Sequence, residues 1–127
     1  MNFAFNPTDG PVIVLAQLWG KQGDLAVQLA LDTGATASVL SWETVVLLGY
    51  DPAATEARVQ ITTGSGVEFA PRVSIDKIEA LGKERLNFPV LCHTLPPSAG
   101  VDGLLGLDFL RGYRLVLDFR TGTLSIE

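Results

Sequence analysis

A carboxylate, a hydroxyl and a glycine stand together where an apolar stretch ends. Asp32, Thr33 and Gly34 directly follow residues 25–31, which are mainly apolar. A carboxylate at the end of a buried strand loses hydration, which costs free energy unless a hydrogen bond or a shared proton compensates. Asp, Thr and Gly are also turn formers, and Asp can accept a hydrogen bond from its own backbone two residues later. The tripeptide alone therefore fits a simple turn as well as an acid–base site.

A second stretch of similar character lies later in the chain. Residues 101–110 again join an apolar strand to a glycine, an acid and a short helical pattern. In this order the two stretches resemble the signature of the retropepsin-like aspartic proteases, and the intervening segments follow the same order over nearly the whole chain. In that family an Asp-Thr-Gly-Ala loop supplies the catalytic carboxylate, and two bulky apolar residues before a glycine support it from behind. The resemblance assigns the loop to Asp32, Thr33, Gly34 and Ala35, and the supporting segment to Leu104, Leu105 and Gly106.

The resemblance implies hydrolysis by two aspartates without a covalent intermediate. One carboxylate takes a proton from water while the other, protonated, polarises the scissile carbonyl, because like charges a few ångströms apart cannot both ionise. The chain has one Asp-Thr-Gly loop and is too short for the two lobes of a pepsin-type enzyme. A symmetric homodimer is therefore implied, in which Asp32 meets Asp32 of the partner subunit. Thr33 is then expected to lock the two loops by hydrogen bonds, and Gly34 to let the substrate backbone pass closely.

A small hairpin is predicted between these two motifs. Extended residues 58–63 and 67–73 flank two glycines and a serine, which favour a flexible tip. Local sequence alone favours an ordinary surface hairpin, whereas its position in the chain favours the flap that closes over substrate in the family. The substrate-binding residues of this flap are then Thr63, Gly64, Ser65 and Gly66. As a phosphate-binding loop the tip is too short, and it has no lysine.

The chain departs from the retroviral pattern at two positions. Retroviral members carry an acid two residues after the loop glycine and an arginine just after the supporting glycine, whereas Thr36 and Leu107 stand here. Because both partners are absent together, no charge is left unpaired, which indicates a coherent variant. The motif at residues 106–110 and the longer, hairpin-like end resemble cellular and bacterial members more closely. We therefore expect a dimer interface that differs from the viral one.

The remaining pattern is mainly β. Strands are predicted at residues 11–19, 25–31, 73–78 and 86–92, and a C-terminal hairpin at 114–119 and 123–126. Short helices are predicted at residues 42–48, between the N-cap Ser41 and the stop signal Gly49, and at 107–112. The pattern indicates a barrel-like or orthogonally packed domain. With the resemblance, we expect a single-lobe retropepsin-like closed β-barrel with one or two short helices, in one domain spanning residues 1–127 with its core at about 10–127.

Composition excludes several other functions. A hydrophobic content of 47% in 127 residues is enough for one buried core, and the net charge of −5, with scattered Lys and Arg, argues against nucleic-acid binding. The single cysteine, Cys92, cannot form an internal disulfide. Cys92 beside the single histidine, His93, supplies too few ligands for a metal site and lacks the third group of a cysteine nucleophile. We therefore expect no metal and no cofactor.

Targeting signals are also missing from the sequence. Residues 1–7 lack the basic and apolar regions of a signal peptide, and no stretch reaches the roughly 18 apolar residues of a spanning helix. We expect no membrane span within this chain, and a cytoplasmic location by default. A soluble domain cut from a longer, membrane-tethered protein is the alternative that stays open.

Three functions remain to be compared. The leading one is a homodimeric aspartic endopeptidase that binds polypeptide as an added strand, with main-chain bonds for affinity and pockets for specificity. The alternative is a retropepsin-like dimerisation or peptide-binding module with little or no turnover, which an Asp32→Asn variant would distinguish because binding could survive the change. The third, phosphoryl transfer through an aspartyl phosphate, needs long helices alternating with strands, and the sequence does not predict them.

Overall fold

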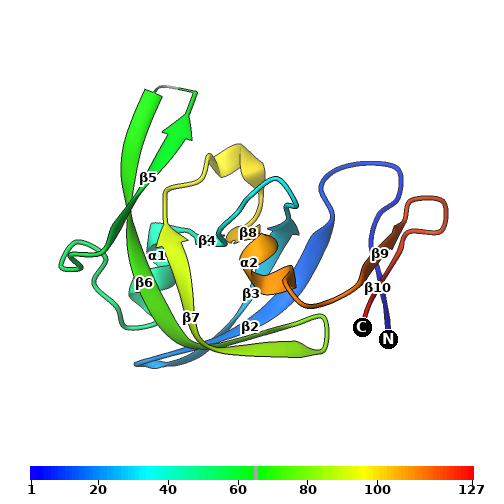
Figure 1. Ribbon diagram of the computed structural model, residues 1–127, viewed down its shortest axis with the longest axis horizontal. Coiled ribbons are helices and arrows are strands. Elements are labelled where there is room, and N and C mark those ends of the chain that lie inside the picture. Colours follow the sequence, from blue (N-terminus) through cyan, green and yellow to red (C-terminus); the bar gives the residue numbers. More distant parts are fainter. Residues whose placement is uncertain (65) are drawn as a thin grey trace.

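The structure, a computed structural model, describes residues 1–64 and 66–127, apart from the side chains of Thr63 and Pro97. Strands dominate these residues (Figure 1). They are β1 (Asn2–Ala4), β2 (Ile13–Gly20), β3 (Gly23–Leu31), β4 (Val39–Leu40), β5 (Arg58–Thr63), β6 (Gly66–Ala80), β7 (Lys83–Cys92), β8 (Gly103–Leu105), β9 (Leu115–Asp118) and β10 (Thr123–Ile126). The helices are α1 (Trp42–Leu47), α2 (Leu107–Leu110) and the 3-10 helix η1 (Pro97–Ala99). No helix in the described residues is long and apolar enough to cross a membrane.

Six of the described strands close into a barrel. Their order is β2-β3-β8-β4-β7-β6, and β2 pairs with β6 to complete the ring. The pairs β3–β8 and β4–β7 are parallel, whereas the others are antiparallel. Alternation along β2 turns Val14, Ala16 and Leu18 into the interior, where burial of apolar surface stabilises the fold. The predicted mainly β closed barrel with two short α-helices is confirmed.

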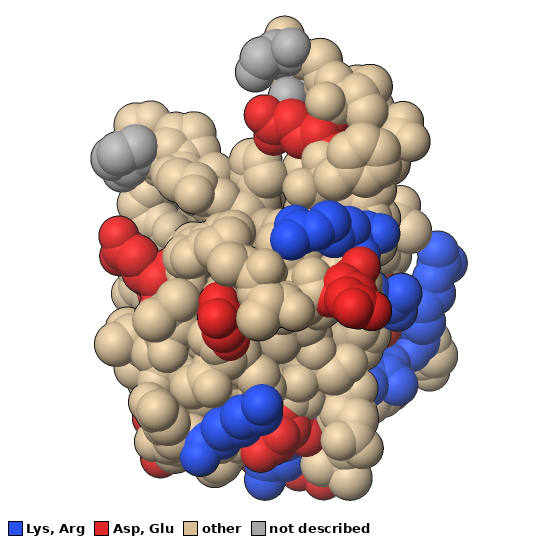
Figure 2. Space-filling view, turned by 90° about the vertical axis from the view of Figure 1, so that its left-hand side faces the viewer, with Lys and Arg blue, Asp and Glu red and all other residues tan. Residues whose placement is uncertain are grey.

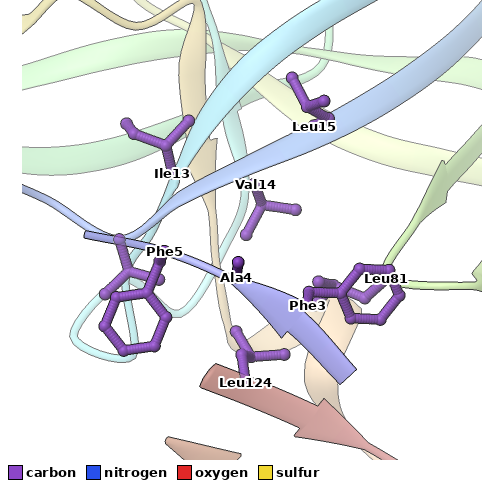
Figure 3. Close-up of a pocket in the computed structure, with 9 residues that line it drawn as sticks. Phe3, Ala4, Phe5, Ile13, Val14, Leu15, Leu81 and Leu124 are labelled. Carbon is purple, nitrogen blue, oxygen red and sulfur yellow. The ribbon is translucent and has the colours of Figure 1, made fainter. Parts of the chain in front are cut away.

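A separate three-stranded sheet joins the two ends of the chain. Its order is β1-β10-β9, and it lies beside the barrel with both termini (Figure 1). The sheet meets β2 across an apolar hollow of about 340 Å³, into which Phe3, Val14 and Leu124 project (Figure 3). Strand β1 was not predicted from the sequence, although Phe3 and Phe5 alternate with smaller residues. The C-terminal hairpin of β9 and β10 is confirmed.

Two predicted boundaries are wrong. Residues 67–73 and 73–78 form one continuous strand, β6, rather than two, because Pro71 lies where the strand changes partners. Pairing with β5 ends at Pro71, opposite Arg58, and pairing with β7 begins at Arg72, so the missing N–H of proline interrupts neither ladder. The second helix ends at Leu110 rather than at residue 112, because Arg111 has an extended backbone with ψ of 135°. The first helix is confirmed, with the Ser41 side chain accepting from Thr44 N.

Candidate active site

The backbone of Asp32 is fixed by a neighbouring strand. Asp32 N donates to the carbonyl of Leu105 in β8 at 2.9 Å, directly after β3 ends. Asp32 Oδ1 accepts from Gly34 N at 2.9 Å, which is the local turn that the residue types predict. The Asp32 side chain is half-buried, whereas Thr33 and Gly34 are exposed. Within the described residues no hydrogen bond reaches Oδ2, so this oxygen is available to a reactant or a second loop.

The predicted supporting segment lies directly behind the loop. Leu105 is fully buried and pairs with Leu31 in the parallel β3–β8 ladder, and Leu104 is half-buried. Leu107 N donates to Ala35 O at 2.8 Å, which ties the start of α2 to the Asp loop. A Cβ added to Gly106 would lie 2.6 Å from the same Ala35 oxygen. Glycine at position 106 therefore allows the two backbones to approach closely.

We expect Gly106→Ala to destabilise the protein by about 1–3 kcal/mol, the usual cost of forcing extra atoms into a packed region. The added methyl group would collide with backbone of the Asp loop, which cannot move away as a flexible side chain could. Urea unfolding measures the change. Gly64→Ala is the matched control, since a Cβ there meets no atom within 4 Å. Equal free energies of unfolding for the two variants would contradict the close approach.

A buried polar network behind the loop was not predicted from the sequence. Ser38, which is 2% exposed, donates to Asp108 twice, from N to Oδ2 at 2.9 Å and from Oγ to Oδ1 at 2.6 Å. Ser38 Oγ also accepts from Gly106 N at 2.9 Å. Phe109 N donates to Asp108 Oδ1 at 2.9 Å, in the first turn of α2, where a negative charge is favourable. The network joins the two segments that carry Thr36 and Leu107.

The other end of α2 is held from β7. Arg85 Nη2 donates to the carbonyl of Phe109 at 2.8 Å and also to that of Arg111. Its guanidinium lies 4.9 Å from the ring centre of Tyr113. A cation at the last carbonyls of a helix satisfies acceptors that have no partner within the helix. Short as it is, α2 is thus fixed at both ends behind the Asp loop.

A hollow of about 540 Å³ separates the Asp loop from the β5–β6 hairpin. Figure 1 shows this hairpin rising above the barrel, and Figure 2 shows a notch beside the uppermost projection of the molecule. Gly34 and Ala35 line the hollow next to Asp32, and most of the other lining residues are apolar. The apolar ones are Ala37, Val39, Val59, Ile61, Leu91, Leu95 and Leu104, and the polar ones are Thr36, Gln60, Thr62 and His93.

The predicted flap residues lie at the end of this hairpin. Thr63 and Gly66 are the last paired residues of β5 and β6, and Gly64 is in the turn. Ser65 lies outside the described residues. The hairpin contributes residues 59–62 to the hollow rather than its tip. Residues 59–62 were not predicted as site residues, although residues 58–63 were predicted to be extended in the hairpin.

Comparison with known proteins identifies the family. A family model described as "Aspartyl protease" matches residues 19–109, which include both motifs. The chain belongs to this family. Among solved structures, a retropepsin-like aspartic protease from Rickettsia conorii shares the fold, with a TM-score of 0.74 and 21% identity over 98% of this chain and 86% of that chain. A search of curated protein sequences found no match.

In this aspartyl protease family member, the neighbouring thiol and imidazole do not form a catalytic pair. Cys92 is 1% exposed, and burial raises the pKa of its thiol to about 11, so the reactive thiolate is scarce at neutral pH. His93 Nε2 instead lies 2.9 Å from Glu68 Oε2. Among the described residues, no group of three or more His, Cys, Asp and Glu is placed to hold a metal ion.

Proposed function

We propose that the protein is an aspartic endopeptidase, active as a homodimer, that hydrolyses peptide bonds through a water molecule activated by Asp32. The observation that supports this most strongly is the position of Asp32. The side chain of Asp32 is half-buried, its backbone is held by β8, and Oδ2 has no hydrogen bond within the described residues. The next residues of its loop, Gly34 and Ala35, line an apolar hollow. Membership of the aspartyl protease family supports a peptide as the substrate.

The proposed chemistry divides two tasks between two copies of Asp32. The ionised carboxylate takes a proton from water, and the resulting hydroxide attacks the peptide carbonyl carbon. The protonated carboxyl polarises the carbonyl oxygen, and the leaving amine then receives a proton as the C–N bond breaks. Both products leave with the atoms of water added, and no bond forms between enzyme and substrate.

The dimer is proposed because one chain offers one Asp-Thr-Gly loop. A two-fold axis through the loop would bring Asp32 next to Asp32 of the partner subunit. Thr33 is exposed, and its hydroxyl makes no hydrogen bond with the described part of its own chain, so it is available to the partner's loop. Gly34 is exposed and has no side chain to block an extended peptide. Substrate would then lie as a strand between hairpin and loop, with apolar side chains in the hollow.

The proposal is tested with a diverse peptide mixture at about pH 4 to 7, the range in which paired carboxylates commonly share a proton. Mass spectrometry identifies new cuts, and the assay is repeated over a dilution series. We expect cleavage whose rate per milligram falls on dilution, because monomers would lack a complete site. Peptide binding without any cuts would instead support a non-catalytic binding module.

A further inference from the structure

An ion pair links the projecting hairpin to the barrel. Glu68 of β6 lies opposite Ile61 of β5, and directly opposed residues of an antiparallel pair share one face. Because Ile61 lines the hollow, Glu68 stands on the side of the hairpin that faces it. Glu68 Oε2 lies 2.9 Å from Nε2 of His93, with side-chain exposures of 48% and 32%.

His93 belongs to the opposite wall of the same hollow. It follows β7 at once, and its backbone N donates to Leu40 of β4 at 3.1 Å, so its position is set by the barrel. His93 lines the hollow and is the one ionisable side chain among the described residues that do so. The ion pair therefore links the hairpin to the opposite wall of the hollow, beside the apolar side chains that line it. The imidazole can donate from Nε2 to the carboxylate whether it is neutral or charged.

The hairpin has little else to hold its outer half. β5 is an edge strand that pairs with β6 alone. On the opposite face of the hairpin, Val67 and Phe69 are 58% and 64% exposed. The described side chains of residues 58–62 and 67–70 make no other hydrogen bond or ion pair to the barrel. Loss of the Glu68–His93 contact would therefore leave the outer hairpin tethered mainly through its own ladder.

We propose that Glu68 and His93 form a latch that positions the hairpin over the cleft before peptide binds. This inference rests on the proposed function, in which peptide lies beneath the hairpin. A hairpin that is already lowered needs less ordering when peptide enters, so the latch improves peptide binding. Neither residue lies in the Asp loop, so both are positioning residues, and their loss acts on KM more than on kcat.

Hydrogen exchange of the hairpin tests the latch without any need for activity. In Glu68→Ala and His93→Ala, we expect amides of residues 58–70 to exchange about two- to fivefold faster, the range for an ion pair of this exposure. Glu68→Gln, which keeps a neutral acceptor, is expected to restore part of the protection. Glu84→Ala is the matched control, because Glu84 pairs with Lys77 on the barrel at 3.9 Å and is also partly exposed. Hairpin exchange equal to wild type in both alanine variants would overturn the latch.

Kinetics then connect the latch to peptide binding. We expect Glu68→Ala to raise KM about two- to fivefold, with kcat changed less than about twofold. A fall in kcat at constant KM would overturn the positioning role. Failure of the proposed function is seen separately, as an absence of cleavage by the wild type, whereas failure of the latch is seen as unchanged hairpin exchange in an enzyme that cleaves.

Discussion

Asp32→Asn is expected to lower the rate of peptide cleavage by about 10²- to 10⁴-fold, the range for removal of a general acid–base group. An amide cannot take a proton from water, so neither subunit of the variant dimer can activate the nucleophile. The fold should persist, because an Asn side-chain oxygen can still accept from Gly34 N as Asp32 Oδ1 does at 2.9 Å. Cleavage is measured with a peptide found in the mixture assay, and folding by circular dichroism.

Asp51→Asn is the matched control for this substitution. Asp51 Oδ1 accepts from Ala53 N at 3.1 Å. Asp51 therefore forms the same kind of local turn as Asp32, with the backbone N–H of the residue two positions later. Asp51 lines a different hollow, with Lys21 and Arg72 rather than the Asp loop. We expect this variant to cleave as the wild type does. Retained cleavage in a well-folded Asp32→Asn variant would assign the chemistry to another residue.

Asp108→Ala should have the largest effect on stability, a loss of about 3 kcal/mol, since a buried donor without a partner costs about 1–3 kcal/mol. The substitution removes the acceptors for Ser38 N and Ser38 Oγ, and one of the two acceptors for Phe109 N, which also donates to Gly106 O at 3.2 Å. Ser38 is 2% exposed and Phe109 is fully buried, so water replaces the lost acceptor poorly. The segment after the Asp loop and α2 would also lose one of their links, while the backbone bond from Leu107 N to Ala35 O remains. Urea unfolding measures the loss.

Two further variants make the Asp108 prediction specific. Asp108→Asn keeps one oxygen acceptor and should fall between wild type and Asp108→Ala. Asp118→Ala removes a carboxylate that also accepts two backbone bonds, from Arg120 N at 2.8 Å and Thr121 N at 3.1 Å, but in an exposed turn. These bonds hold the pKa of Asp118 below its usual value. If Asp108→Ala were no less stable than Asp118→Ala, the buried network would not support the loop.

The sequence predicted those parts of the fold that depend on nearby residues. Ser41 and Gly49 bound the first helix through local bonds and a positive φ of 96°, and both were read from residue type. The alternating C-terminal hairpin was likewise predicted correctly. The Asp loop and its supporting segment were found as a pair because each has a recognisable sequence. In the structure they meet through Asp32 N and Leu105 O.

Contacts between distant residues could not be predicted in this way. Ser38 and Asp108 are 70 positions apart, and each has an ordinary local role as a loop hydroxyl or an acid in a first helical turn. Glu68 and His93 meet only because β6 and β7 are adjacent strands of the barrel. The continuity of β6 past Pro71 was not predicted either, since the effect of a proline depends on which ladder it interrupts. β1 forms because the barrel brings the C-terminal hairpin to the start of the chain.

In the proposed enzyme one active site is built from two copies of Asp32, and mixing of subunits is the direct test. Wild-type protein at constant concentration is mixed with an equal amount of Asp32→Asn and left to exchange subunits, and peptide cleavage is then measured. A shared site predicts that activity falls to about half, because mixed dimers carry only one Asp32. Further additions of the variant should lower it toward zero. Activity that stays constant throughout the titration would contradict a site shared between two subunits.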